Sequence, residues 1–121
     1  MNSDPKHNQR QKGRRYEWQA EQFLIFRGFR ILERNWQAGH KEIDLIAVHD
    51  RLIVFVEVKA GLTDRYGHPA EWVDRKKQEN LISAARQYIL EKNLQDFDFR
   101  FDLITFFEGR LEHFPDAFQT S

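Results

Sequence analysis

The spacing of hydrophobic residues predicts a helix near the start of the chain and another in its second half. Over residues 14–27 apolar residues recur at helical spacing, and Gly28 follows as a typical helix terminator. Residues 71–92 carry a second apolar stripe of this kind. Residues 1–13 are polar and lack periodicity. We therefore expect a mobile tail followed by a single domain over residues 14–121.

The remaining apolar segments have the length and composition of strands. One is expected over residues 29–36, and nearly continuous apolar runs over 43–48 and 52–59 predict two more that are covered on both faces. Residues 99–107 suit a fourth strand and residues 110–114 a short fifth. The order helix, three strands, helix, strand predicts an α/β fold.

Three charged residues interrupt the two apolar strands in the middle of the chain. They are Asp44 in the first strand, and Glu57 and Lys59 in the second. Ionised groups in such surroundings are costly to bury without a partner or a metal. Glu57 and Lys59 point the same way, because alternate residues of a strand share a face. The loop over residues 60–70 follows directly, as loops that shape a site often do.

Whether Asp44 joins this pair depends on the turn between the two strands. A loop with an even number of residues, such as Asp50 and Arg51, places Asp44 opposite Glu57, with Cβ atoms about 4.5–5.5 Å apart. An odd loop pairs Asp44 with Val56 and, barring a bulge, sends it to the other face of the sheet. The functional interpretation therefore predicts the even register.

Two carboxylates so close repel each other, and the pKa of one rises unless a cation lies between them. Mg²⁺ or Mn²⁺ suits this place, because both prefer hard oxygen ligands. Such an ion polarises a phosphodiester oxygen and orients a bound water, while Lys59 could hold the attacking water and offset charge on the phosphorus oxygens. A glutamate and a lysine two residues apart more often form a surface ion pair. The position of Asp44 and the apolar flanks favour the site.

The two predicted helices offer further candidates. Glu17 shares a helix side with Ala20 and Leu24, so it could lean toward the sheet as an additional metal or water ligand, or be a solvated helix residue. Lys77 occupies a position of the apolar stripe, where lysine is unexpected. It either approaches a phosphate or extends its ammonium group to solvent.

The charges are balanced overall but unevenly distributed. The 121 residues include 19 basic and 19 acidic ones, so the whole protein does not have the charge of a nucleic-acid binder. Residues 1–34 carry eight basic and four acidic groups, which leaves eleven and fifteen for the remainder. A basic first third, which includes Arg14 and Arg15, can contact phosphates. A solvated helix face with a basic tail explains the same charges.

Several classes of site and of protein are excluded or disfavoured. The lack of cysteine excludes disulfides, thiolate nucleophiles and cysteine-ligated zinc. The five histidines lack a metal-ligand spacing, so we expect them at the surface or in turns. No Walker loop or nucleophile elbow occurs. No run approaches the roughly 20 apolar residues of a membrane span, and we expect a cytoplasmic protein without membrane contact.

Asp44 and the string 57–59 resemble the PD-(D/E)xK nuclease signature, although no proline precedes the aspartate. The order of elements resembles the restriction-endonuclease-like αβββαβ core, a mixed central sheet flanked by helices. More narrowly, residues 13–118 resemble the YraN family of uncharacterised bacterial proteins. The matching positions are Gly13, Glu17, Ala20, 42–46, 55–59, Gly67, Val73, Lys77, Ala85 and 100–102.

That family is similar in core and site to archaeal Holliday-junction resolvases, where a glutamate of the first helix, an aspartate and a glutamate-x-lysine string bind a divalent metal. The resemblance implies that Glu17, Asp44 and Glu57 are metal ligands. It also implies that Lys59 belongs to the catalytic site.

Three hypotheses follow. The first is a Mg²⁺-dependent endonuclease acting on DNA, with branched or otherwise non-duplex DNA as one option, Mn²⁺ as a substitute ion, and Arg14, Arg15 and Lys77 on the nucleic acid. The second is a non-catalytic nucleic-acid-binding module that keeps the nuclease fold. The third is a protein-interaction domain whose many phenylalanines supply dimer contacts as well as core. A homodimer would suit the cutting of two strands, and the sequence leaves this open, as it does DNA against RNA.

Overall fold

The computed structural model describes residues 5–62 and 66–119, with residues 5–12 described by their backbone alone. Its elements follow the predicted α/β order, with helices flanking one sheet. They are α1 (Pro5–Phe26), β1 (Arg30–Ala38), β2 (Lys41–His49), β3 (Leu52–Ala60), the short 3₁₀ helix η1 (Pro69–Trp72), α2 (Arg75–Glu91), β4 (Asp98–Phe107) and β5 (Arg110–Phe118). The predicted restriction-endonuclease-like order is confirmed, with β5 as one further strand.

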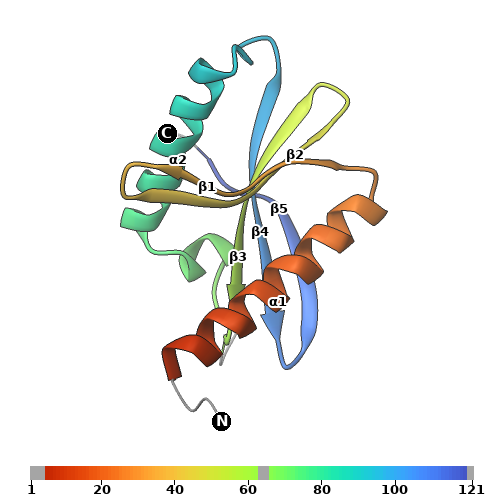
Figure 1. The fold of residues 1–121 in the computed structure, drawn as a ribbon, viewed down its shortest axis with the longest axis vertical. Helices are drawn as coiled ribbons and strands as arrows, with labels where there is room; N and C mark the ends of the chain where they lie inside the picture. Colours follow the sequence, from red (N-terminus) through yellow and green to blue (C-terminus); the bar gives the residue numbers. More distant parts are fainter. Residues whose placement is uncertain (1–4, 63–65, 120–121) are drawn as a thin grey trace.

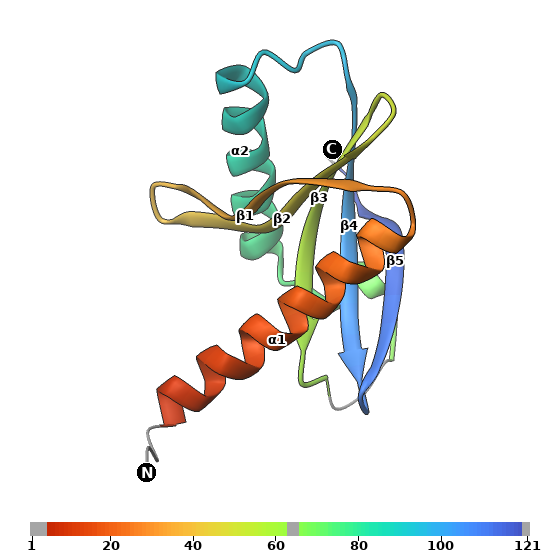
Figure 2. The same ribbon diagram turned by 45° about the vertical axis from the view of Figure 1, so that its right-hand side comes forward.

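The five strands form one mixed sheet in the order β1-β2-β3-β4-β5. Only β3 and β4 are parallel among these neighbours, because α2 carries the chain from the end of β3 back to the start of β4. The two helices α1 and α2 lie on opposite faces of the sheet (Figures 1 and 2). The central strands are therefore covered on both sides, which explains their nearly continuous apolar sequences.

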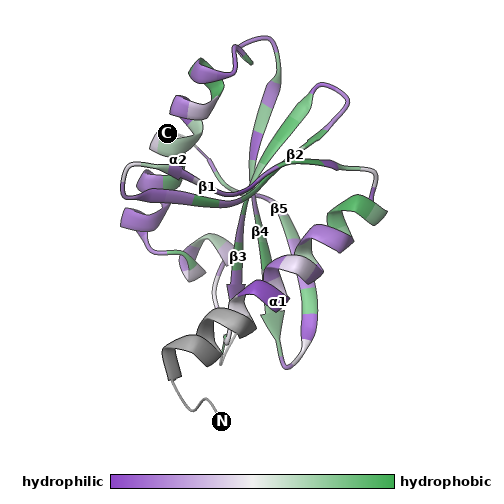
Figure 3. Ribbon diagram, viewed as in Figure 1, coloured by the Kyte–Doolittle hydropathy of each residue, from purple (hydrophilic) through white to green (hydrophobic). Residues whose placement is uncertain are grey.

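Each face of the sheet has its own apolar layer. Under α2 the layer is built around Phe55 and Leu103, and under α1 it is built around Leu24, Val54 and Ile104. Figure 3 shows the hydrophobic residues gathered in the central strands and at the carboxyl-terminal end of α1. In the ranges that the structure describes, no helix is both long and apolar enough to cross a membrane.

The first helix begins earlier than predicted. It starts at Pro5, so residues 5–13, which we expected to belong to a mobile tail, have a helical backbone. Proline suits the first helical position, because its missing N–H has no helical partner there. Gly13 does not end the helix, since glycine in a helix costs only about 1 kcal/mol relative to alanine. The other part of the expected tail, residues 1–4, lies outside the described residues.

Two other boundaries differ from the prediction. The second helix begins at Arg75 rather than at residue 71, because the Asp74 side chain caps it by accepting a hydrogen bond from the Lys77 N–H (2.8 Å). The last strand extends to Phe118, four residues further than expected. Proline at position 115 does not stop it, because β5 is an edge strand whose outer N–H groups have no ladder partner.

Candidate active site

The hairpin between β2 and β3 has the register that brings Asp44 and Glu57 opposite each other. Its turn contains two residues, Asp50 and Arg51, and the antiparallel ladder keeps one register throughout. In that register Asp44 and Glu57 form the next pair after the last ladder pair. The predicted even register is confirmed. Asp50 adopts a positive φ of 53°, which aspartate tolerates in tight turns.

Strands β2 and β3 diverge at this position. Both Figure 1 and Figure 2 show the β1–β2 hairpin extending away from the lower half of β3. The Val58 N–H donates a hydrogen bond to Asp44 Oδ2 (2.8 Å), so a carboxylate oxygen takes the place that a backbone carbonyl would have in a continued ladder. The two carboxylates therefore lie where the sheet opens.

Glu57 is almost buried, and one of its carboxylate oxygens has no hydrogen-bond partner among the described residues. Its side chain is 10% exposed, and Lys77 Nζ lies 3.8 Å from Oε1, within ion-pair distance but beyond hydrogen-bond distance. Among the described residues no group donates a hydrogen bond to Oε2. Burial, followed by the negative charge of Asp44, raises the pKa of Glu57 to about 9. Burial also raises the pKa of Asp44, although the Val58 N–H opposes this. Without a cation, the pair holds a proton at neutral pH.

This carboxylate pair fits a hard divalent cation. A cation beside it would remove the repulsion between Asp44 and Glu57 and would give Glu57 Oε2 a partner. Among the side chains that the structure describes, in residues 13–62 and 66–119, no three histidines, aspartates or glutamates converge closely enough to hold a metal by themselves. Mg²⁺ commonly takes one or two carboxylates and keeps several waters. Asp44 and Glu57 could therefore hold Mg²⁺ as its two carboxylate ligands, with waters in the remaining positions.

Two lysines lie in the same small hollow as Glu57. The hollow has a volume of about 250 Å³, and Lys59, Lys77, Val73 and Asp74 complete its lining. Lys59 comes from the end of β3 and Lys77 from the first turn of α2. Lys77 Nζ lies 3.8 Å from Glu57 Oε1 and the side chain is 47% exposed, so its ammonium group borders both the carboxylate and solvent. Two ammonium groups next to a carboxylate pair suit a phosphate that lies beside a cation.

Glu17 lies near Asp44, but within the described part of the chain it belongs to no group of three carboxylates that could hold a metal. It is half-buried on α1, and its Oε2 accepts a hydrogen bond from Asn35 Nδ2 (3.0 Å). The same amide donates to Glu42 Oε1 (2.8 Å). Burial raises the pKa of Glu17, and the negative charges of Asp44 and Glu42 add to this. The sequence prediction missed Asn35 and Glu42. The position of Glu42, two residues before Asp44, was the signal that could have revealed it.

The two arginines of α1 differ in their relation to the site. Arg14 lines a hollow of about 370 Å³ together with Gly13, Glu17 and Asn35. Arg15 is its exposed neighbour and does not line this hollow. Of the predicted nucleic-acid contacts, Arg14 and Lys77 therefore adjoin the acidic groups directly.

A buried ionic network lies on the other face of the sheet from Glu57. Asp102 is fully buried and accepts hydrogen bonds from Arg100 Nε (2.7 Å), from the backbone N–H of Asp116 (3.0 Å) and, through Oδ2, pairs with His113 Nε2 (2.8 Å). The ion pair of Arg100 and Asp102 was expected. His113 was expected at the surface or in a turn, and this was wrong, because its side chain is only 13% exposed within β5. The network's satisfied partners indicate a structural role.

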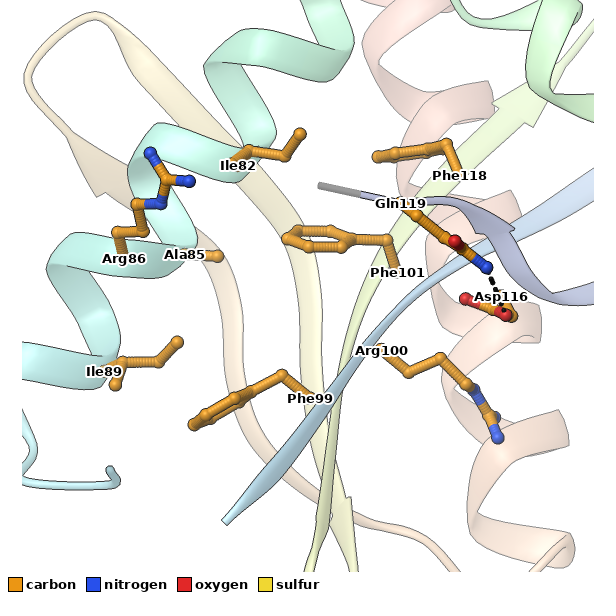
Figure 4. A pocket seen from close by; sticks show the side chains of 10 residues that line it. All are labelled: Ile82, Ala85, Arg86, Ile89, Phe99, Arg100, Phe101, Asp116, Phe118 and Gln119. Atoms are coloured by element: carbon orange, nitrogen blue, oxygen red, sulfur yellow. Dashed lines mark hydrogen bonds between the residues drawn. The ribbon is translucent and has the colours of Figure 1, made fainter. Parts of the chain in front are cut away.

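An apolar groove lies between α2 and the strands β4 and β5 (Figure 4). Its volume is about 460 Å³. Phe99, Phe101 and Phe118 face the α2 residues Ile82 and Ile89 across it. None of the predicted site residues lines this groove, so it is separate from the carboxylate pair.

Comparison with known proteins identifies the family. A model described as "Uncharacterised protein family UPF0102" matches residues 16–106, a range that contains the carboxylate pair and both lysines of the hollow. A UPF0102 protein of Sulfurihydrogenibium sp. (strain YO3AOP1) is 39% identical over 108 residues, which cover 89% of this chain and 94% of the relative. One from Hahella chejuensis is 42% identical over 112 residues, 88% of each chain. Another, from Chloroherpeton thalassium, is 45% identical over 92 residues, 76% of this chain and 71% of the relative. The chain belongs to the uncharacterised protein family UPF0102, which is the YraN-like family that its motifs resemble.

Proposed function

We propose that this protein is a Mg²⁺-dependent endonuclease that hydrolyses phosphodiester bonds of DNA. The observation that carries the proposal is the buried pair of Asp44 and Glu57, with an unpartnered oxygen on Glu57, next to a hollow lined by Lys59 and Lys77. A carboxylate pair that suits a cation and a hollow whose two lysines suit a phosphate thus lie side by side. Metal-assisted phosphodiester hydrolysis needs both.

Each residue has a distinct part in this proposal. Asp44 and Glu57 would hold the ion, and the Val58 N–H fixes the orientation of the Asp44 carboxylate. When bound, the ion supplies a Lewis acid and lowers the pKa of a bound water. Lys59 would orient the attacking water and offset negative charge on the phosphorus oxygens. Lys77 would bind a non-bridging phosphate oxygen from the other side of the hollow.

A non-catalytic nucleic-acid-binding module is the second candidate. The observation that favours it is that, within the described part of the chain, no third histidine or carboxylate completes a metal-binding cluster. Such a module would bind DNA in a salt-dependent way and leave it uncut.

A cleavage assay distinguishes the endonuclease from the non-catalytic binding module. Labelled duplex, single-stranded and four-way-junction DNA would each be incubated with the protein and Mg²⁺, with EDTA as the metal-free control. We expect metal-dependent cleavage, and a loss of about 100-fold or more in Asp44→Asn and Lys59→Ala, because each removes a group that acts on the reacting phosphate or its ion. Comparing the three substrates tests the branched or non-duplex preference.

Asp50→Asn is the matched control, because it removes a carboxylate at the far end of the same hairpin and asparagine tolerates the positive φ of 53°. It should cleave like the wild type. Equal residual cleavage in Asp44→Asn and Lys59→Ala would point to a contaminating nuclease and reject the proposal. Salt-sensitive binding without any cleavage would select the binding module.

A further inference from the structure

Asn35 occupies an unusual position in the β1–β2 pair. The ladder pairs the residues on either side of Asn35 with those on either side of Asp44, so the two face each other across the strands. Asn35 has a φ of 49°, a left-handed backbone conformation that strands rarely contain and that asparagine tolerates better than most residues. Such conformations persist where the surroundings hold them in place, and they cluster at functional sites.

The side chain of Asn35 joins carboxylates from two different elements. Its Nδ2 donates to Glu17 Oε2 of α1 (3.0 Å) and to Glu42 Oε1 of β2 (2.8 Å), so both N–H groups of the amide are used. Among the described residues, Asn35 is the only side chain that donates a hydrogen bond to either glutamate. Asp44 is close enough for its negative charge to act on Glu17.

The amide therefore opposes a repulsion between like charges. Glu17, Glu42 and Asp44 carry the same charge, and Glu17 is half-buried, so it would turn toward solvent if nothing held it. A neutral amide with two donors can hold two carboxylates together without competing for a cation. A lysine or arginine at position 35 would bring a positive charge that competes with the ion.

We infer that Asn35 is a positioning residue of the metal site, and that it holds Glu17 near Asp44 so that Glu17 can accept a hydrogen bond from a water on the ion. This inference rests on the proposed metal site. A contact that only joined α1 to the sheet would change stability and leave cation affinity unaltered. A positioning role changes cation affinity, and it does so through Glu17.

The test is a double-mutant cycle on Mn²⁺ affinity, measured by isothermal titration calorimetry on the whole chain. Asn35→Gly removes the amide while glycine adopts the positive φ without strain. We expect Mn²⁺ binding about 10-fold weaker in Asn35→Gly, in the range found for residues that orient metal ligands. Glu17→Gln should weaken it by a similar factor. The double variant should bind no more weakly than the weaker single variant, because the two act as one unit.

Asp50→Gly is the matched control, since it makes the same kind of change at a positive φ of 53° at the far end of the β2–β3 hairpin. It should bind Mn²⁺ like the wild type. Wild-type affinity in Asn35→Gly, or fully additive losses in the double variant, would overturn the inference. A wild type that binds no Mn²⁺ would reject the metal site and this inference with it. A wild type that binds Mn²⁺ and cuts no DNA would reject only the nuclease.

Discussion

At the scale of single residues, Asp44 and Glu57 form a carboxylate pair that no lysine or arginine in the described part of the chain reaches at hydrogen-bond distance. Lys77 Nζ stays 3.8 Å from Glu57, and Glu57 Oε2 has no donor among the described residues. In the absence of metal a proton takes this place, because burial and the charge of Asp44 raise the pKa of Glu57 from 4.5 to about 9. Proton and metal ion therefore compete for one position.

This competition predicts how stability depends on pH. The native state of the metal-free protein holds a proton on Glu57 that the unfolded chain releases above pH 4.5, so stability should fall between pH 4.5 and about 9. Below pH 4.5 Glu57 is protonated in both the native and the unfolded state, and its contribution to stability is fully present. Above about pH 9 Glu57 is ionised in both states, and this contribution is lost. Glu57→Gln should remove this component and be more stable than the wild type at pH 9.

Urea denaturation in EDTA at pH 5, 7 and 9 would measure this contribution, as the difference in the free energy of unfolding between Glu57→Gln and the wild type at each pH. Glu91→Gln, an exposed helix glutamate, is the control and should follow the wild type. Saturating Mn²⁺ should restore wild-type stability at high pH and leave Glu57→Gln almost unchanged. Parallel pH profiles for wild type and Glu57→Gln would contradict the shared-proton description of the pair.

Residue identity also decides how much of the site the sequence could reveal. Asp44, Glu57 and Lys59 were recognisable because charged residues are rare in buried strands. Asn35 was not, because a hydrogen bond between side chains of different elements leaves no regular spacing in the sequence. Glu42 was overlooked, although its place two residues before Asp44 could have revealed it. The backbone conformation that places the Asn35 amide leaves no such pattern either.

At the scale of elements, apolar periodicity located the helices and strands but not all of their ends. The run over 52–59 matches β3 closely, because both of its faces are buried. The start of α2 was missed, because the His68 cap and Pro69 form a separate 3₁₀ turn before the Asp74 cap. The divergence of β2 from β3 at Asp44 leaves no periodic pattern in the sequence, so local sequence could not predict it.

The strands themselves, rather than the turn, should fix the register of the site. A slip of one residue between β2 and β3 would move every side chain of one strand to the other face, and both faces are apolar and tightly packed. One glycine inserted between Asp50 and Arg51 should therefore form a three-residue loop with a bulge. Mn²⁺ affinity should stay within about twofold of the wild type, with a small loss of stability from the longer loop.

Calorimetry of Mn²⁺ binding and urea denaturation would check both parts. A glycine inserted between Glu108 and Gly109, in the β4–β5 turn, serves as the control for the cost of loop extension. Loss of Mn²⁺ binding in the folded Asp50–Arg51 insertion variant alone would show that the turn determines the register.

At the scale of the whole molecule, the balanced net charge conceals an uneven arrangement. Arg14 lines one hollow with Glu17, and Lys77 lines another with Glu57, so a basic group adjoins a carboxylate in each hollow. The balance of 19 basic and 19 acidic residues would otherwise disfavour contact with a polyanion. Phosphates would approach where the basic groups are, and a bound cation would offset the carboxylates between them.

This arrangement predicts a localised salt dependence of DNA binding. In EDTA, the affinity of the wild type for short DNA should fall as the salt concentration rises. The triple variant Arg14→Ala/Arg15→Ala/Lys77→Ala should reduce the magnitude of the slope of log K against log [salt] by about two to three. The reason is that DNA binding releases about one counterion fewer for each phosphate contact that is lost. The control is Arg30→Ala/Arg86→Ala/Lys92→Ala, which removes three exposed basic groups from the other end of the sheet, the second half of α2 and the C-cap of that helix. It has the same net charge as the first triple variant, so a general electrostatic attraction would weaken binding equally in both. Fluorescence anisotropy of labelled DNA, measured from low to moderate salt, distinguishes binding at the carboxylate site from a general electrostatic attraction. Equal slopes in the two triple variants would show that the nucleic acid is not held at the carboxylate site.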